Sequence, residues 1–152
     1  MAWVIQIRPG RDFEHGVFRT FDALNDYRNF ETVVPAIKAA GKHFQGCICY
    51  TMTEPRMGGE VYNLDYYVQK AKDLEAMGAD SICIKDMAGL ITPYMAYDLV
   101  KRLKETLSIP VHLHSHATSG MATATYVEGV LAGAGAIGGL YLLFVVLERL
   151  RE

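Results

Sequence analysis

The sequence predicts an α/β fold in which helices cover a parallel sheet. Short segments rich in β-branched residues alternate with longer segments of helical periodicity, which is typical of repeated βα units. The strand ends at Phe21, Cys49, Lys85 and His114 are 28, 36 and 29 residues apart, close to the roughly 31 residues per unit of an eight-unit barrel. The clearest predicted strands are Gly16–Asp22, Lys42–Tyr50, Ala79–Lys85 and Pro110–His114.

Two amphipathic helices are predicted between these strands. Leu64–Met77 and Pro93–Leu107 each place apolar residues on one face, at the spacing of a helix that packs on a sheet. Thr92 is the predicted N-cap of the second helix, because a proline follows it at the first helical position. Gly41 and Gly78 lie where a helix ends with a residue of positive φ.

The length of the chain limits how much of a barrel it can form. With 152 residues, 51% of them hydrophobic, the chain has room for a single domain over 1–152. About five βα units fit in that length, too few to close an eight-stranded barrel. We therefore expect a partial TIM-type (β/α) barrel, a parallel sheet covered by helices. Its two edges need cover from another copy, as in a homo-oligomer, or from another chain, unless the sheet opens into a flatter, doubly covered form.

The two ends of the sequence are less regular than the middle. Trp3–Arg8 alternates like a strand, but Pro9 and Gly10 interrupt it. Gly129–Leu147 is nineteen residues without a charge, which reaches the lower range of a transmembrane helix. We expect no membrane span there, because glycine is frequent and the segment is better buried against the sheet as a strand or short helix.

Composition and charge exclude several classes of partner. A net charge of −2 and a pI near 6.2 create no field that would gather nucleic acid or an anionic membrane surface. No signal-peptide pattern opens the sequence, so a cytoplasmic protein is expected. Cys47, Cys49 and Cys83 lie in apolar strands, which favours reduced, buried thiols over a pair of metal ligands.

Three histidines alternate at the end of the last predicted strand. In an extended strand the imidazoles of His112, His114 and His116 project to one side, whereas Leu113 and Ser115 project to the other. Neutral imidazole binds divalent zinc, manganese or cobalt, so two of the three can share one ion. The alternative is a polar strand end in which the histidines only satisfy hydrogen bonds.

A lysine ends another apolar strand. Lys85 projects to the same side as Cys83, which is the inner side if the strand belongs to a barrel. A salt bridge to a nearby carboxylate is the ordinary role for such a lysine. The alternative is metal ligation, which requires a deprotonated or carbamylated amine because an ammonium group has no lone pair to give.

Three motifs together resemble a known family. They are Phe18–Asp26 (F-R-T-F-D-A-L-N-D), Lys85–Gly89 (K-D-M-A-G) and His112–Gly120 (H-L-H-S-H-A-T-S-G). These segments resemble the carboxyltransferase domain of biotin-dependent enzymes, of the oxaloacetate decarboxylase α-subunit, pyruvate carboxylase and transcarboxylase type. The resemblance covers about residues 16–133, which is most of the chain.

The resemblance implies a TIM barrel with a metal-dependent active site. The ligands of the divalent metal would be His114, His116 and a carbamylated Lys85, with His112 one layer below in a structural role. Arg19 would lie near the substrate, since its planar guanidinium suits a keto-acid carboxylate, although an arginine at a strand end can equally be a salt-bridge partner. The implied catalytic residues are thus Lys85 and Arg19. The implied substrate is pyruvate or oxaloacetate, and biotin would be carried on a separate domain or chain.

The sequence also departs from the family pattern. It contains no R-D-A-H-Q-S-like motif, in which the family has an aspartate as a further metal ligand, and no residue matches the family's catalytic threonine. We therefore expect the isolated chain to be catalytically incomplete. A non-catalytic, truncated scaffold or assembly module is one alternative. An aldolase-like metal-dependent lyase or synthase acting on acyl-CoA thioesters is another, but the K-D-M-A-G motif argues against it.

Overall fold

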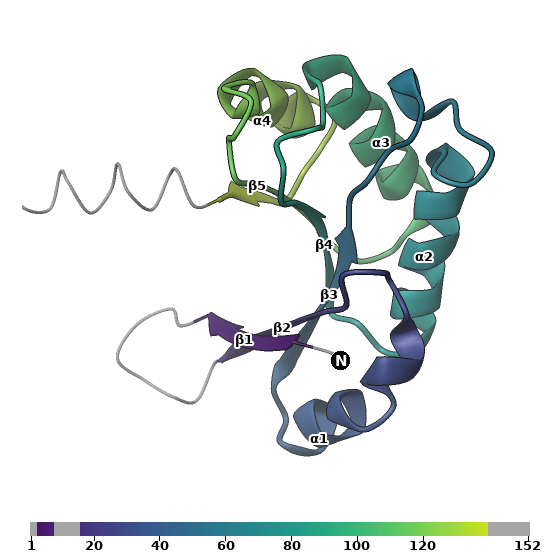
Figure 1. Cartoon of the computed structure of the whole chain (residues 1–152). Helices are drawn as coiled ribbons and strands as arrows, with labels where there is room; N and C mark the ends of the chain where they lie inside the picture. Colours follow the sequence, from purple (N-terminus) through teal and green to yellow (C-terminus); the bar gives the residue numbers. More distant parts are fainter. Residues whose placement is uncertain (1–2, 8–15, 140–152) are drawn as a thin grey trace, which may run out of the picture.

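The computed structural model describes residues 3–7 and 16–139, which form an α/β fold (Figure 1). Six strands make one sheet, and neighbours in the sequence are neighbours in the sheet. The strands from β2 to β6 are parallel, whereas β1 pairs antiparallel with β2. The strands are β1 Trp3–Ile7, β2 Val17–Phe21, β3 His43–Cys49, β4 Ser81–Asp86, β5 Val111–Ser115 and β6 Ala136–Gly138.

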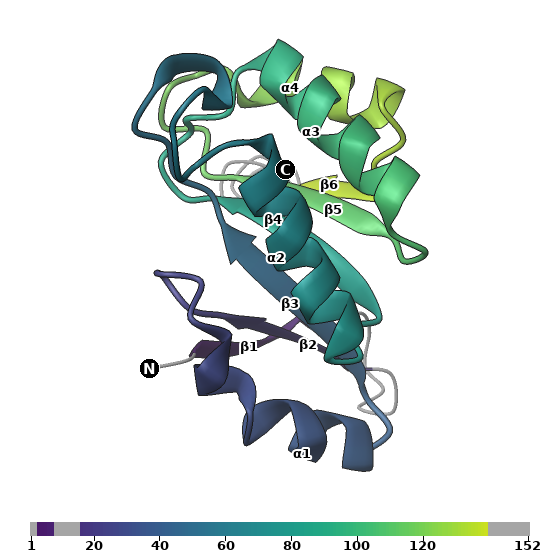
Figure 2. The same ribbon diagram turned by 90° about the vertical axis from the view of Figure 1, so that its right-hand side faces the viewer.

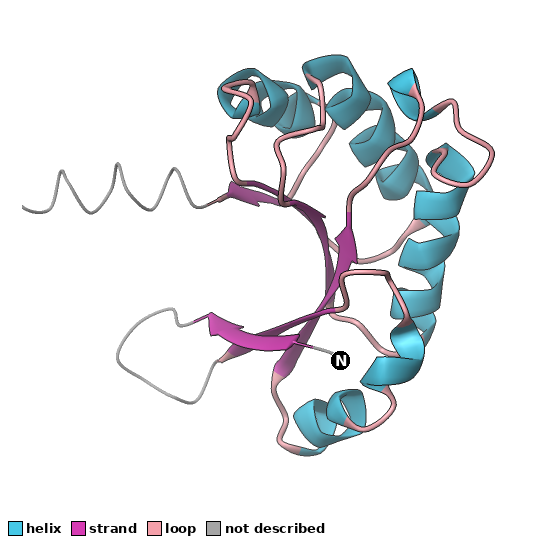
Figure 3. Cartoon of the chain, in the orientation of Figure 1, coloured by secondary structure: helices cyan, strands magenta, loops and turns pink. Residues whose placement is uncertain are grey.

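The helices form one layer on the convex side of the curved sheet, as Figures 2 and 3 show. Each α-helix connects two successive parallel strands, which is the βα repeat that the sequence predicts. They are α1 Val33–Ala39, α2 Leu64–Ala76, α3 Pro93–Thr106 and α4 Ala122–Leu131, with the short 3-10 turns η2 Tyr27–Phe30 and η3 Pro55–Met57.

The barrel is not closed in the described part of the chain. There β1 and β6 are the edges of the sheet, and the strands bend around an open concave side (Figure 1). The prediction of an α/β fold and a partial (β/α) barrel is therefore confirmed. The irregular segment near the N-terminus does form a strand, Trp3–Ile7, but it is an antiparallel edge strand rather than the start of a βα unit.

The helix ends agree with the predicted glycine positions but not with the predicted cap. Gly41 and Gly78 have φ of 64° and 91°, as predicted for residues that follow a helix. Helix α3 begins at Pro93, but Thr92 makes no side-chain capping hydrogen bond. In the uncharged stretch 129–147, α4 ends at Leu131, a turn follows and β6 spans Ala136–Gly138, whereas residues 140–147 lie outside the described residues. Within residues 3–7 and 16–139, no helix has the length and apolar character needed to cross a membrane.

The hydrophobic core lies between the sheet and the helices. Strand residues with outward side chains, such as Ile48, Ile84 and Leu113, are fully buried against helix residues such as Leu99. Because side chains alternate along a strand, the residues between them project to the concave side. That side is lined by polar and titratable groups, and it holds the candidate site.

Candidate active site on the concave face

The strand register brings the predicted site residues level with one another. Cys49 of β3 is paired with Lys85 of β4, and Lys85 is paired with His114 of β5. The register between β2 and β3 pairs Thr20 with Gly46, so β2 ends two residues before the level of Cys49. Such a stagger is what tilted strands in a barrel require. The backbone of Cys49 is therefore left without a β2 partner.

The side chain of Asn25 takes the place of the missing strand. Its Oδ1 accepts a hydrogen bond from the backbone N–H of Cys49 at 2.7 Å, and its Nδ2 donates to the carbonyl of Cys49 at 3.0 Å. Asn25 is 2% exposed and has a φ of 55°, a conformation that asparagine tolerates better than most residues. Sequence reasoning missed this role, because the L-N-D segment directly after a strand indicates a turn but not the partner of its asparagine.

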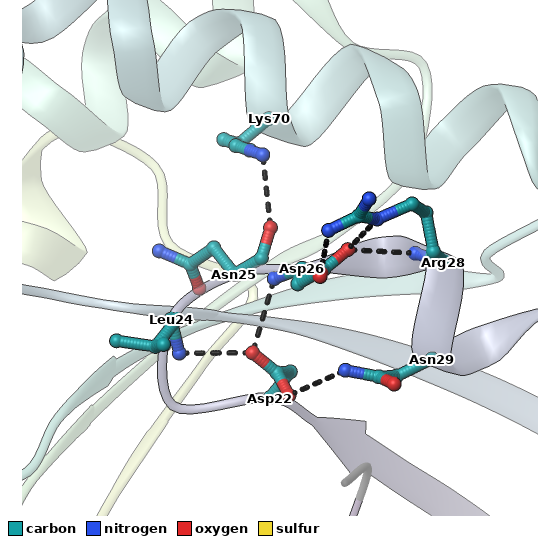
Figure 4. A network of polar contacts seen from close by, with 7 residues as sticks. All are labelled: Asp22, Leu24, Asn25, Asp26, Arg28, Asn29 and Lys70. Carbon is teal, nitrogen blue, oxygen red and sulfur yellow. Dashed lines mark hydrogen bonds and ion pairs between the residues drawn. The ribbon is translucent and has the colours of Figure 1, made fainter.

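Asp22 holds the turn that presents Asn25 (Figure 4). Its carboxylate accepts hydrogen bonds from the backbone N–H groups of Leu24 and Asp26 at 2.9 and 3.0 Å. The side-chain amide of Asn29 donates a third bond at 2.9 Å. Burial would raise the pKa of Asp22, but these hydrogen bonds outweigh it and leave the pKa lowered. The motif F-D-A-L-N-D thus has a structural purpose: it fixes the end of β3 beside the site.

A second pair of loops is fixed in a similar way at the ends of β4 and β5. Asp86 accepts hydrogen bonds from the backbone of Leu90 and Ile91 at 2.9 and 3.0 Å, which closes the loop of the K-D-M-A-G motif. A Cβ atom at Gly89 would lie 2.9 Å from the backbone nitrogen of Ser119, so only glycine allows the two loops to touch. The hydroxyl of Ser119 donates to the carbonyl of Gly89 at 2.6 Å.

Arg19 reaches from β2 across the concave face to the histidines of β5. It is 6% exposed, and its Nε donates to Oε1 of Gln45 at 2.7 Å. One terminal nitrogen lies 3.0 Å from Nδ1 of His112, and the other lies 3.4 Å from Nδ1 of His114. Among the residues that the structure describes, the partners of Arg19 are thus neutral groups rather than a carboxylate. Sequence reasoning missed Gln45, a polar residue at an inward position of β3.

The two histidines of β5 and His116, which directly follows the strand, are held in the neutral form. Burial, followed by the charge of Arg19, lowers the pKa of His112 to about 4 and that of His114 to about 3. Burial and then the charge of Lys85 lower the pKa of His116. Because Arg19 can only donate, the proton of a neutral His112 or His114 that accepts from it lies on Nε2. Both Nε2 atoms are buried and have no hydrogen-bond partner among the described residues.

Lys85 lies beside this row of imidazoles. It is 6% exposed, and its Nζ is 4.5 Å from the centroid of the Phe21 ring. Lys85 makes no ion pair with a carboxylate of residues 16–139. The salt bridge that the sequence analysis gives as the ordinary role of such a lysine is therefore absent from that part of the chain. The ring centroids of His114 and His116 are 5.1 Å apart, with the rings inclined by 73°.

These residues fit a divalent metal in part. The buried Nε2 of His114 has no partner in the described part of the chain, and a neutral imidazole next to a second one is a suitable donor set. Binding through Nε2 would place the proton of His114 on Nδ1, and the long contact with Arg19 would then be lost. Among the described residues, no three His, Cys, Asp or Glu side chains are grouped to hold an ion. Within residues 16–139, the third ligand that the family resemblance implies is Lys85, as a carbamate.

The lowered histidine pKa values predict a pH-dependent stability. In the folded chain His112 and His114 stay neutral down to about pH 4 and 3, whereas in the unfolded chain they take up protons below about pH 6.5. The unfolded state therefore binds more protons in that window, and the free energy of unfolding should fall as the pH falls from 6.5. Urea unfolding of the wild type and of His112→Asn between about pH 5 and 6.5 tests this. The slope of the free energy of unfolding against pH should be smaller in the variant than in the wild type, by up to about 1.4 kcal/mol per pH unit. Equal slopes in the two proteins would contradict the prediction.

Comparison with known proteins identifies the family. The chain belongs to the HMGL-like family, whose model matches residues 21–140. It is 56% identical over 118 residues to a pyruvate carboxylase subunit of Methanocaldococcus jannaschii, with 78% of this chain and 20% of that protein covered. It is 42% identical over 123 residues to the methylmalonyl-CoA carboxyltransferase 5S subunit of Propionibacterium freudenreichii, with 80% and 23% covered.

Solved structures show the same relationship. The carboxyl transferase domain of Rhizobium etli pyruvate carboxylase, in complex with pyruvate, matches with a TM-score of 0.75 at 41% identity. The same domain with pyruvate and biocytin matches with a TM-score of 0.73 at 40% identity, and each match covers 79% of this chain and 20% of the other. The resemblance inferred from the motifs is confirmed, and the chain spans about a fifth of the length of these relatives.

Proposed function

We propose that this chain forms the metal-binding and keto-acid-binding part of a biotin-dependent carboxyltransferase site. The observation that carries the proposal is the cluster on the concave face. There the Nε2 of His114 has no partner among the described residues, and His114 lies in contact with Arg19 and level with Lys85. The substrate is pyruvate or oxaloacetate, and the carboxyl carrier is biotin on a separate domain or chain. The names of the relatives, and the related structures with pyruvate and biocytin, support this choice.

The residues of the chain have separate roles in this proposal. His114, His116 and a carbamylated Lys85 hold a zinc, manganese or cobalt ion. When bound, such an ion supplies Lewis acidity that lowers the energy of the enolate of a keto acid. Arg19 turns its two terminal N–H groups from the histidines to the substrate carboxylate, for which its planar fork is suited. Gln45 positions Arg19 through the bond to Nε.

Binding of the keto acid tests the proposal directly. Calorimetry with the manganese-loaded chain should detect pyruvate binding, and Arg19→Gln should weaken it at least about tenfold, since a charge-assisted bidentate contact is lost. Metal affinity should change less in this variant, because Arg19 is no ligand. The proposal is wrong if pyruvate does not bind to the wild type, or if it binds equally to Arg19→Gln.

Turnover by the isolated chain is not expected. Catalysis requires the metal, the carboxylate-binding arginine and a proton-transfer group to be held together. No proton-transfer group is identified among the described residues. Oxaloacetate loss in the presence of the chain, excess manganese and free biotin should therefore equal the rate with manganese alone. A rate above this blank that Lys85→Ala abolishes would show that the chain, or an oligomer of it, has a complete site.

A further inference from the structure

A series of hydrogen bonds leads from Arg19 across the concave face, toward the N-terminal ends of β3 and β4. Nε of Arg19 donates to Oε1 of Gln45 at 2.7 Å, and Nε2 of Gln45 donates to Oγ of Ser81 at 3.0 Å. Nε2 of His43 lies 2.7 Å from the same hydroxyl oxygen. Gln45 and Ser81 are 6% and 5% exposed, so each needs the partners that this series provides.

The strand register places these four residues on one face of three adjoining strands. Arg19 of β2 is paired with Gln45 of β3, and Gln45 is paired with Ser81 of β4. His43 lies two residues before Gln45 on β3 and therefore shares its face. The strands β2, β3 and β4 are neighbours in the sheet (Figure 1), so the series crosses the sheet from one strand to the next.

The chemistry of the four groups gives the series one direction. The Nε–H of an arginine can only donate, so Gln45 turns its carbonyl oxygen toward Arg19 and its amide nitrogen toward Ser81. Ser81 accepts from Gln45, and its own O–H is then free to donate to Nε2 of a neutral His43. An amide turned the other way would bring two donors together at Arg19. Ser81 therefore holds the orientation of the Gln45 amide from its far side.

The bond to Gln45 is the anchor of the guanidinium of Arg19. It is 2.7 Å long, whereas the terminal nitrogens lie 3.0 and 3.4 Å from the imidazoles of His112 and His114. In the proposed function the terminal N–H groups turn to the substrate carboxylate, and the bond to Gln45 remains. The series orients groups and does not relay a proton, because a guanidinium keeps its protons. The alignment of Arg19 with a carboxylate thus depends on how firmly the Gln45 amide is held.

We propose that Ser81 is a positioning residue for Arg19, acting through the amide of Gln45, and that His43 supports Ser81 at the end of the series. This role rests on the proposed function in that Arg19 binds the substrate carboxylate, but the orientation of Arg19 itself needs neither metal nor substrate. The effect of a substitution should decrease with its distance from Arg19, in the order Gln45, Ser81, His43.

NMR of the metal-free, isotope-labelled chain measures how firmly Arg19 is held. Its Nε–H, identified as the arginine signal that Arg19→Gln removes, should be protected from hydrogen exchange in the wild type. Ser81→Ala should reduce this protection roughly three- to tenfold, the equivalent of one hydrogen bond. Ser81→Thr keeps the hydroxyl and should restore the protection. Gln45→Leu should have a larger effect than Ser81→Ala, and His43→Phe a smaller one.

Thr20→Val is the matched control for the loss of a hydroxyl from a strand. Thr20 is fully buried in β2, and its hydroxyl has no partner among the described residues. The substitution should leave the exchange of the Arg19 Nε–H unchanged. Equal protection in the wild type and Ser81→Ala would overturn the positioning role. So would an equal loss in Thr20→Val and Ser81→Ala, because the signal would then follow the stability of the fold alone.

Pyruvate binding distinguishes a failure of this role from a failure of the proposed function. In the manganese-loaded chain, Ser81→Ala should weaken pyruvate binding at least about threefold, and Ser81→Thr should bind like the wild type. Manganese affinity should be the same in all three proteins. If the wild type binds no pyruvate, the proposed function is wrong, and the exchange of the Arg19 signal alone decides whether Ser81 positions Arg19. If the wild type and Ser81→Ala bind pyruvate equally, Ser81 has no role in the site.

Discussion

Replacing His114 and His116 together by alanine should lower the affinity of the chain for manganese, cobalt or zinc at least about a hundredfold. Both imidazoles are held neutral, and the Nε2 of His114 is buried without a partner among the described residues, so each can give a lone pair at pH 7. The wild type should bind one ion weakly, because fewer than four protein ligands are identified. Metal content after purification should therefore be below one ion per chain.

Calorimetric titration of the wild type and the double variant with each metal measures this loss of affinity. His112→Ala is the matched control, because it is the same substitution on the same strand one layer further from the predicted ligands, and it should retain most of the affinity. If Lys85 joins as a carbamate, bicarbonate should raise the affinity of the wild type but not that of Lys85→Ala. Equal metal uptake by the wild type and the double variant would show that His114 and His116 do not form a metal site.

Strand positions could be predicted from the sequence because the alternation of βα units is local. The predicted strands Gly16–Asp22 and Lys42–Tyr50 run one residue past the observed ends at Phe21 and Cys49. The strands predicted to end at Lys85 and His114 extend one residue further than predicted. The shared face of His112 and His114 follows from the two-residue period of a strand. Their contact with Arg19 joins residues more than ninety positions apart and depends on sheet curvature, which no local pattern specifies.

The roles of Asn25 and Gln45 could not be predicted for the same reason. Asn25 is needed only because β2 ends before the level of Cys49, and this stagger is a property of the assembled sheet. Gln45 is a polar residue in an apolar strand, and its partners Arg19 and Ser81 lie on the two neighbouring strands, which no local pattern places beside it. Motif resemblance pointed to the segment that contains Asn25, but it gave no physical reason for that residue.

Asn25→Gly should destabilise the chain by roughly 2–4 kcal/mol, the largest effect we expect from a substitution outside the apolar core. The backbone N–H and carbonyl of Cys49 are buried, and both lose their partner when the amide is removed. Glycine keeps the positive φ of this position, so the loss reports the bonds of the side-chain amide, which also donates to the hydroxyl of Tyr66 at 3.1 Å. Asn25→Ala should cost about 1 kcal/mol more, because alanine also resists that φ.

Urea unfolding at pH 7 measures these differences, and Asn29→Ala is the control. Asn29 is exposed and gives one bond to Asp22, so its loss should cost less than about 1 kcal/mol. The backbone N–H of Tyr50, next to Cys49, donates to the carbonyl of Lys85 at 2.9 Å. A displaced end of β3 should therefore also move Lys85, and metal affinity should fall in Asn25→Gly at temperatures where the variant is still folded. An Asn25→Gly variant as stable as Asn29→Ala would show that the amide is not a substitute for the missing strand.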